Sequence, residues 1–197
     1  MELLLIAQRG MDYAAYRALV WQVVAEKRTT GPDQSEFMVG YTALNKVRME
    51  RNERTVKLLP ELEEVLRNTP PMTWLVLTEA WCGDASQSIP VMDLMARHAP
   101  AIDLRFVLRD EHPALMDRYL TNGTRSIPKL IAMDAECREL FNWGPRPAPA
   151  QALMMAQKAL PEAERLPKEK LYEQVHGWYA KDRGVAVQRE FLELLPR

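Results

Sequence analysis

The chain has 197 residues, 47% of them apolar, and its 26 basic and 27 acidic side chains leave a formal net charge of −1. Single domains usually contain about 100 to 200 residues, so this length predicts one hydrophobic core with additional elements outside it. The balanced charge lacks the basic excess that holds nucleic acids or anionic membranes, and neither is expected as a partner. The apolar run over residues 3–7 is too short for a signal peptide or a membrane span, so we expect a cytoplasmic protein.

Residues 1–71 are predicted to form a helical N-terminal extension. Apolar side chains recur at helical spacing over residues 11–28, which predicts one amphipathic helix. Asp33, followed by a glutamate three residues later, has the capping-box pattern and predicts the start of a second helix that extends to about residue 54. A short third helix is predicted over residues 60–68, because a proline suits its first turn and two consecutive prolines follow it.

Residues 72–160 have a different pattern, in which short apolar runs alternate with helical segments. The first of these runs is continuous, which is typical of a strand buried on both faces. The predicted elements in chain order are a strand over residues 74–77, a helix over 82–98, a strand over 102–108, a helix over 113–120, strands over 129–133 and 137–141 that form a hairpin, and a helix over 150–160. Asp110 is the predicted cap of the second helix. The order βαβαββα indicates an α/β fold.

Residues 161–197 are predicted to form a helical C-terminal extension, because apolar side chains recur at helical spacing over residues 168–195. The apolar stripes of both extensions cannot remain in water, so we expect the extensions to pack on the core. The expected organisation is therefore an N-terminal extension over 1–71, a central domain over 72–160, and a C-terminal extension over 161–197 packed on that domain.

Cysteine and histidine are scarce in this chain. Cys82 and Cys137 are too few for a disulfide scaffold, so any disulfide chemistry would be transient. His98, His112 and His176 have no spacing that forms a metal site, and each is interpreted as an ordinary helix residue. We therefore predict no metal and no other cofactor.

Three features of the central domain occur together at the spacings of one family. Trp-Cys-Gly-Asp-Ala at residues 81–85 lies between the first strand and its helix, Pro90 follows Cys82 by eight residues, and Ser-Ile-Pro at 126–128 precedes a strand. This set resembles the thioredoxin family, which has Trp-Cys-Gly-Pro-Cys, a helix-kinking proline and a cis-proline at these places. The resemblance covers residues 72–160 and implies a thioredoxin-like three-layer α/β/α sandwich with a mixed central sheet. The whole chain is also similar to a group of bacterial thioredoxin-family proteins of unassigned activity.

Two departures from the family pattern change the chemistry that the resemblance implies. Ala85 stands where the second cysteine would attack the mixed disulfide formed by the first, so an autonomous two-cysteine cycle is excluded. Val76 stands where the family buries an aspartate that assists proton transfer. The resemblance therefore implies one redox cysteine, Cys82, without the usual proton relay.

Cys82 is the predicted catalytic residue. As the cap of a helix that begins at Gly83, its thiolate would be stabilised by the free N–H groups and the dipole of the first turn, which lowers the thiol pKa below about 8.5. Asp84 has the opposite effect, because a nearby carboxylate disfavours a second negative charge. The balance between these effects stays open at the level of the sequence, and a buried, inert cysteine is the alternative.

The residues around Cys82 are the predicted substrate-binding site. Trp81 would cover one side of the thiol, or would only close the end of the strand. A cis bond at Pro128 would orient the backbone of Ile127 so that an extended peptide or glutathione can pair with it. The predicted substrate-binding residues are Trp81, Gly83, Asp84, Ile127 and Pro128.

Cys82 and Cys137 are predicted not to form a disulfide with each other. The strand over 129–133 carries the chain roughly 16 Å away from the cysteine end before the hairpin turns back. A disulfide requires Cα atoms about 4.4 to 6.8 Å apart, so the resolving thiol must belong to another molecule.

Two classes of function remain open on this evidence. The first is a monothiol redox protein, in which Cys82 attacks a disulfide or a glutathionylated thiol of a protein or small molecule, and an external thiol completes the cycle. The second is a non-catalytic thioredoxin-fold module that binds a peptide or a protein beside Pro128. A redox sensor that forms a sulfenic acid at Cys82 is a third, weaker interpretation.

Overall fold

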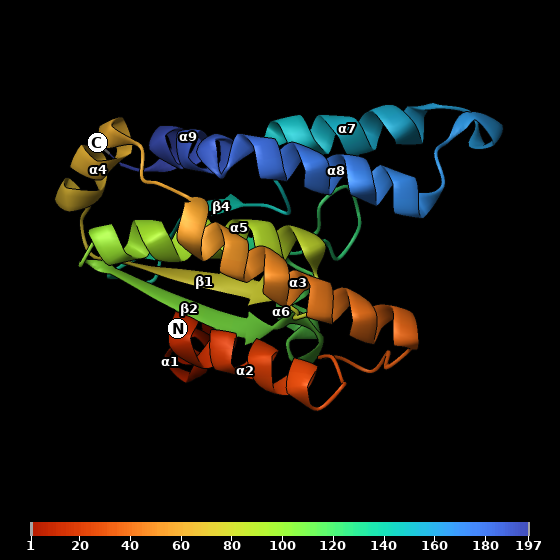
Figure 1. The fold of residues 1–197 in the computed structure, drawn as a ribbon. Coiled ribbons are helices and arrows are strands. Elements are labelled where there is room, and N and C mark those ends of the chain that lie inside the picture. Colours follow the sequence, from red (N-terminus) through yellow and green to blue (C-terminus); the bar gives the residue numbers. More distant parts are fainter. Residues whose placement is uncertain (1, 197) are drawn as a thin grey trace.

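The structure is a computed structural model that describes residues 2–196, and its centre is a four-stranded sheet with the strand order β2-β1-β3-β4 (Figure 1). The strands are β1 (Met72–Thr78), β2 (Ile102–Leu108), β3 (Lys129–Asp134) and β4 (Glu139–Trp143). β1 is parallel to β2 and antiparallel to β3, and β3 is antiparallel to β4. The predicted α/β fold with a mixed sheet is therefore confirmed.

Helices lie on both sides of this sheet and complete the predicted three layers (Figure 1). They are α1 (Glu2–Arg9), α2 (Tyr13–Ala25), α3 (Glu36–Thr55), α4 (Pro60–Asn68), α5 (Gly83–His98), α6 (Pro113–Met116), α7 (Ala148–Ala159), α8 (Lys168–Asp182) and α9 (Val185–Leu194), with short 3-10 turns η1 (Arg109–Glu111) and η2 (Glu162–Glu164). Within residues 2–196, no helix combines the length and the apolar character needed to cross a membrane.

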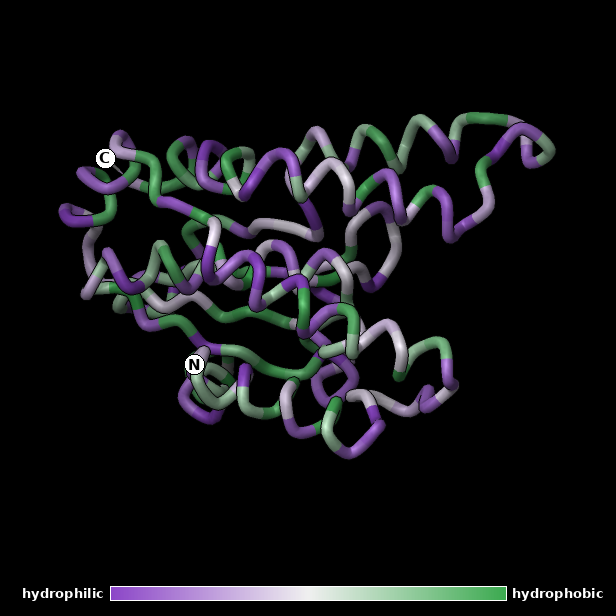
Figure 2. The backbone as a smooth tube through the Cα atoms, viewed as in Figure 1, coloured by the Kyte–Doolittle hydropathy of each residue, from purple (hydrophilic) through white to green (hydrophobic). Residues whose placement is uncertain are grey.

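The central strand β1 is buried on both faces, as its continuous apolar run predicts. Trp74, Leu75, Val76 and Leu77 are all completely inaccessible to solvent. β2 is only half-buried at its start, where Asp103 is exposed between two buried neighbours. Figure 2 shows hydrophobic segments gathered along these strands and hydrophilic segments on the outer helices. The strands therefore form the centre of the core, against which the helices pack.

The two helical extensions pack against different parts of the sheet. Met11 forms an isolated antiparallel bridge with Phe106 of β2, with N–H···O distances of 2.8 Å in both directions. Tyr16 of α2 stacks on the same phenyl ring, with centroids 5.1 Å apart. Phe191 of α9 packs against Trp143 of β4, with centroids 5.6 Å apart, and against Trp74 of the central strand, with centroids 5.0 Å apart. An uncovered edge strand can pair with other chains, and the N-terminal extension occupies part of this position beside β2.

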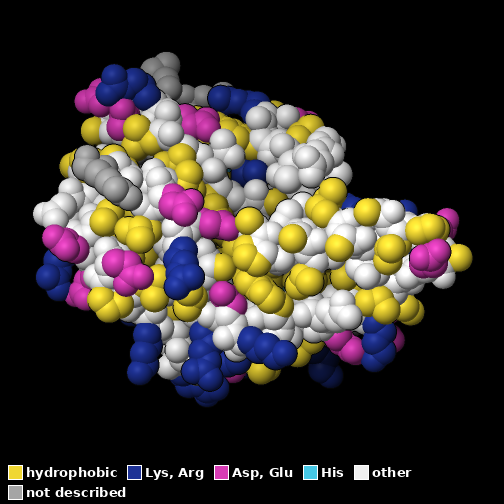
Figure 3. Space-filling view, turned by 90° about the horizontal axis from the view of Figure 1, so that it is seen from above, with side chains coloured by type: hydrophobic (Ala, Val, Ile, Leu, Met, Phe, Trp, Pro, Cys, Tyr) yellow, Lys and Arg dark blue, Asp and Glu magenta, His cyan; other side chains and the backbone are white. Residues whose placement is uncertain are grey.

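The C-terminal extension is two helices rather than one. α8 and α9 are separated at Arg183 and Gly184, whose φ angles of 54° and 78° lie in the left-handed region. A side chain at Gly184 would also meet Val91, because its Cβ would lie 2.8 Å from the Val91 Cγ2 atom. α7 and α8 form a hairpin that projects from the body and carries hydrophobic side chains along its length (Figures 1 and 3).

Two of the three predicted helix caps, Asp33 and Asp110, are wrong. α3 is capped by Ser35, whose Oγ accepts a hydrogen bond from the Met38 N–H (3.4 Å), whereas Asp33 accepts one from the Ser35 N–H (3.0 Å). Asp110 lies within η1, and its N–H donates to the buried Glu79 carboxyl group (2.9 Å). That contact holds the chain in a 3-10 turn, so the following helix α6 has a single turn and no side-chain cap.

Cys137 does not begin the return strand of the hairpin, as the sequence predicts, but lies in the turn between β3 and β4. The Asp134 carboxylate accepts hydrogen bonds from the N–H groups of Glu136 (3.0 Å) and Arg138 (2.9 Å), which closes a tight turn. Cys137 adopts a φ of 63° within this turn, and β4 starts two residues later. Cys82 and Cys137 are both free thiols.

Candidate functional site

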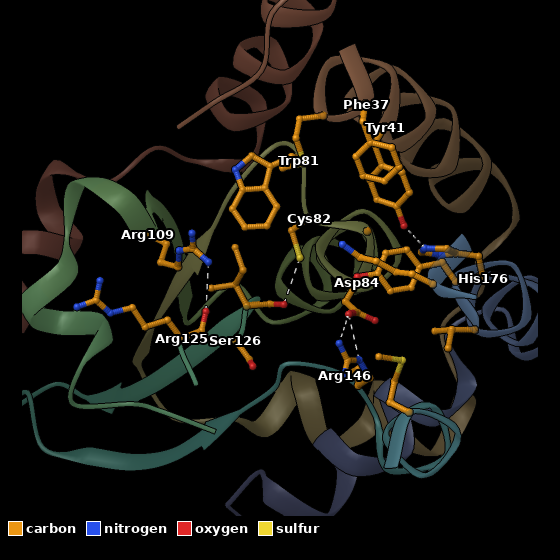
Figure 4. A pocket seen from close by; sticks show the side chains of 17 residues that line it. Phe37, Tyr41, Trp81, Cys82, Asp84, Arg109, Arg125, Ser126, Arg146 and His176 are labelled. Atoms are coloured by element: carbon orange, nitrogen blue, oxygen red, sulfur yellow. Dashed lines mark hydrogen bonds and ion pairs between the residues drawn. The ribbon is translucent and has the colours of Figure 1, made fainter. Parts of the chain in front are cut away.

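Cys82 lies where the central strand β1 leads into α5. It is the N-cap of α5, and its Sγ accepts a hydrogen bond from the Ala85 N–H (3.4 Å). The loop before β3 brings Ile127 to the thiol, and the Ile127 carbonyl accepts a hydrogen bond from the Cys82 S–H (3.2 Å; Figure 4). The Ile127–Pro128 peptide bond is cis. The tertiary structure thus joins two predicted site residues that are 45 positions apart.

A pocket of about 270 Å³ opens beside Cys82. Five of the six predicted site residues line it, namely Trp81, Cys82, Gly83, Asp84 and Ile127. Pro128 does not, and its carbonyl oxygen faces Gly144, where a Cβ would lie only 2.1 Å away. The predicted site residues therefore form one side of the pocket, with Pro128 behind it.

The opposite side of the pocket comes from helices outside the predicted central domain. We call it the α3–α8 wall, and it consists of Phe37, Tyr41, Lys168, Tyr172 and His176. Figure 4 shows Trp81 and Arg109 on one side of Cys82, and Tyr41 and His176 on the other. The extensions therefore supply one side of the site in addition to packing on the sheet.

The Cys82 thiol is protonated at neutral pH. Burial, and then the negative charge of Asp84, raise the pKa of Cys82 to about 12, while the Ala85 N–H and the Arg146 guanidinium act weakly in the opposite direction. The side chain is only 6% exposed. The helix N-terminus was expected to lower the pKa, but burial has the larger effect. The free energy needed to remove a thiolate from water exceeds the stabilisation that the first turn of the helix gives to it.

Asp84 is held inside the protein by two partners from distant segments. Its Oδ2 accepts hydrogen bonds from Arg146 Nε (3.0 Å) and Nη2 (2.6 Å), and its Oδ1 accepts one from the Tyr179 hydroxyl (2.8 Å). Arg146 also donates to Gln151 (2.8 Å). These bonds attach the β4–α7 loop and α8 to the first turn of α5.

His176 is not the ordinary helix residue that the sequence suggests, because it lies in the pocket. Its Nε2 is 2.6 Å from the Tyr41 hydroxyl, and its Nδ1 is 3.0 Å from Gln87 Nε2. Burial, and then the charges of nearby arginines, lower the pKa of His176 to about 3, so the ring is neutral at physiological pH. No local signal could reveal the Tyr41–His176 pair, since its members are 135 positions apart.

Gly83 is required by this pair, and replacing it by alanine is expected to lower the free energy of unfolding by about 1 to 2 kcal/mol. A Cβ at Gly83 would lie 2.8 Å from the Tyr41 hydroxyl and from two ring atoms of His176. Neither ring can move freely, because each is hydrogen bonded to the other and His176 is also bonded to Gln87. Denaturant unfolding of the variant measures the loss.

Gly177→Ala is the matched control for this change. Gly177 is also helical and follows His176 directly, but a Cβ there meets no atom within 4 Å. Alanine should therefore stabilise α8 by about 0.5 to 1 kcal/mol, through its higher helix propensity. If the Gly83 variant were stabilised to the same degree, the Tyr41–His176 pair could not lie against α5.

The rim of the pocket is rich in cations. The Arg109 guanidinium lies over the Trp81 ring, 4.7 Å from its centroid, and donates to the Arg125 carbonyl (3.2 Å). Arg109 and Arg125 have aspartate partners, whereas Lys168 contacts only aromatic rings among the described residues. Within residues 2–196, no cluster of three or more potential ligands is arranged to hold a metal ion.

Comparisons with known proteins agree with this architecture. A family model described as thioredoxin matches residues 31–163. A protein of unknown function from Pseudomonas aeruginosa, PA1234, has a similar crystal structure, with a TM-score of 0.58 and 22% identity over 95% of this chain and 93% of that one. An HIV epitope-scaffold has a TM-score of 0.54 and 21% identity over 94% of this chain and 92% of that one. At these identities the two structures show a shared fold alone. No curated protein matches the chain.

Proposed function

Because this chain belongs to the thioredoxin family, we propose that it is a binding module of that fold, which receives a peptide or a small molecule beside Cys82 without thiol–disulfide exchange. The state of the Cys82 thiol carries this proposal. The thiol is buried, has a pKa of about 12, and donates a hydrogen bond to the Ile127 carbonyl. Exchange requires a thiolate, and this pKa keeps the thiol protonated at pH 7.

The position of the second cysteine also supports the proposal. Asp134, next to the turn that holds Cys137, pairs with Met72 at the start of β1, whereas Cys82 follows the other end of that strand. Ala85, at the resolving position of the family motif, is fully buried and has no sulfur. A redox cycle would therefore depend on a thiol from another molecule.

The monothiol redox function remains the second candidate, because one contact favours it. Cys82 lines the pocket and its Sγ accepts the Ala85 N–H, which is the contact that stabilises a thiolate at a helix N-terminus. In this candidate Cys82 attacks a disulfide or a glutathionylated thiol, and a small external thiol releases the product.

Alkylation of Cys82 separates the two candidates. In a Cys137→Ser variant, the rate of reaction with iodoacetamide is expected to rise about tenfold per pH unit from about pH 7 to 10, without a plateau, because the thiolate fraction rises in this way below the pKa. The same variant unfolded in urea is the control, and its rate should level off near the ordinary cysteine pKa of about 8.5.

A turnover assay provides the independent measurement. The protein is expected not to accelerate the reduction of hydroxyethyl disulfide by glutathione, and Cys82→Ser should not change this result. Acceleration that depends on Cys82, together with an alkylation plateau below about pH 8, would establish the monothiol function in place of the binding module.

A further inference from the structure

The orientation of the polar groups in the α3–α8 wall is determined by a chain of side chains that begins at Gln87. Its Oε1 accepts hydrogen bonds from Arg51 Nη2 (2.6 Å) and Asn52 Nδ2 (3.0 Å), both of which can only donate. The amide nitrogen of Gln87 therefore faces the other way, and it donates to His176 Nδ1 (3.0 Å). His176 Nδ1 is thus an acceptor.

His176 transmits this orientation to Tyr41. The imidazole is neutral, so with Nδ1 as the acceptor its single N–H is on Nε2 and donates to the Tyr41 oxygen (2.6 Å). Burial raises the pKa of Tyr41, which keeps its own hydroxyl hydrogen. The Tyr41 oxygen thus has two cationic or N–H neighbours, His176 Nε2 and the Arg48 guanidinium, whereas its O–H hydrogen, on the wall of the pocket, has no acceptor among residues 2–196.

The charges around this donor favour an anionic acceptor. Four cations line the pocket, of which Arg109, Arg125 and Arg146 already pair with aspartates, so Lys168 is the one without a carboxylate partner among the described residues. The one carboxylate in the lining, Asp84, is already bonded to Arg146 and Tyr179. The Lys168 ammonium has no carboxylate partner in the described chain and lies over two rings of the wall, 5.8 Å from the Phe37 centroid and 5.6 Å from that of Tyr172.

We infer that the α3–α8 wall binds a carboxylate that is attached to an apolar or aromatic group. The carboxylate accepts the Tyr41 O–H and faces the Lys168 ammonium, while the apolar group packs against Phe37 and Tyr172. Because the pocket, at about 270 Å³, is smaller than most drug-sized sites, the ligand group is about the size of one amino acid. This inference rests on the proposed binding function and names the ligand class for it.

The test compares two probes that differ only in charge, N-acetylphenylalanine and its C-terminal amide, by isothermal titration calorimetry on the full chain. The acid is expected to bind at least about tenfold more tightly than the amide, because a hydrogen bond and an ion contact to a charged group typically exceed that factor. Tyr41→Phe keeps the ring and removes the donor, and Lys168→Gln removes the charge. Each should reduce the preference for the acid about tenfold or abolish it.

Lys170→Gln is the matched control, since Lys170 is on the same helix, pairs with Glu173 and does not line the pocket. It should leave both affinities unchanged. Equal binding of acid and amide, binding of neither probe, or an unchanged preference in Tyr41→Phe would overturn the carboxylate site. None of these results depends on Cys82. The alkylation and turnover measurements therefore test the proposed binding function independently of the carboxylate site.

Discussion

Replacing Phe191 by alanine is expected to lower the free energy of unfolding by about 3 to 5 kcal/mol, as for other large aromatic side chains in cores. Phe191 is completely buried and joins α9 to two strands of the sheet. Its ring centroid lies 5.0 Å from that of Trp74 and 5.6 Å from that of Trp143. These large rings cannot move into the space that the Phe191 ring leaves. The cost of the resulting cavity therefore adds to the free energy lost with the buried apolar surface. Denaturant unfolding followed by circular dichroism measures the change.

Leu194→Ala is the control on the same helix. Leu194 is 36% exposed, and its removal should cost less than about 1 kcal/mol. If both variants lost a similar free energy of unfolding, the loss would reflect the helix propensity of α9 and not its packing on the sheet. A loss below about 1 kcal/mol for Phe191→Ala would contradict the packing of α9 on the sheet.

Replacing Arg146 by methionine is expected to cost about 3 kcal/mol, because it leaves the Asp84 carboxylate largely buried without its cation. The two side chains are only 17% and 14% exposed, and the closest contact between them is 2.6 Å. Methionine keeps much of the buried volume, so the loss reflects the missing charge and hydrogen bonds. Tyr179 alone would remain as a donor to Asp84.

A double variant isolates the charge effect from packing. Asp84→Asn combined with Arg146→Met should be more stable than Arg146→Met alone, because no unpaired buried charge remains. Arg138→Met is the surface control. Arg138 is 73% exposed and pairs with Asp134, and its replacement should change stability by less than about 1 kcal/mol. If the Arg138 and Arg146 variants lost the same amount, the Asp84–Arg146 pair would be behaving as a surface ion pair.

The sequence alone determined the α/β fold, the order of the elements from β1 to α7, and the position of Cys82 at the start of α5, but it predicted neither α1 nor the break between α8 and α9. These features depend on local signals. A continuous apolar run predicts the buried strand β1, and the prolines that flank residues 60–68 delimit α4. The motif at residues 81–85 places the cysteine at the strand–helix junction in any thioredoxin-like chain. Local competition also explains the two wrong caps, since Ser35 and the Glu79 contact outweigh Asp33 and Asp110.

Only the tertiary structure decided the chemistry of the site. The protonation state of Cys82 depends on how completely the surrounding fold excludes water from it. The Tyr41–His176 pair joins α3 to α8, and the Asp84–Arg146 pair joins α5 to the loop before α7. Periodicity and turn residues specify elements one at a time, whereas desolvation and hydrogen-bond geometry depend on which elements meet. For that physical reason the pattern of this chain predicts a cysteine at the start of α5, whereas the burial that keeps its thiol protonated follows from the tertiary structure.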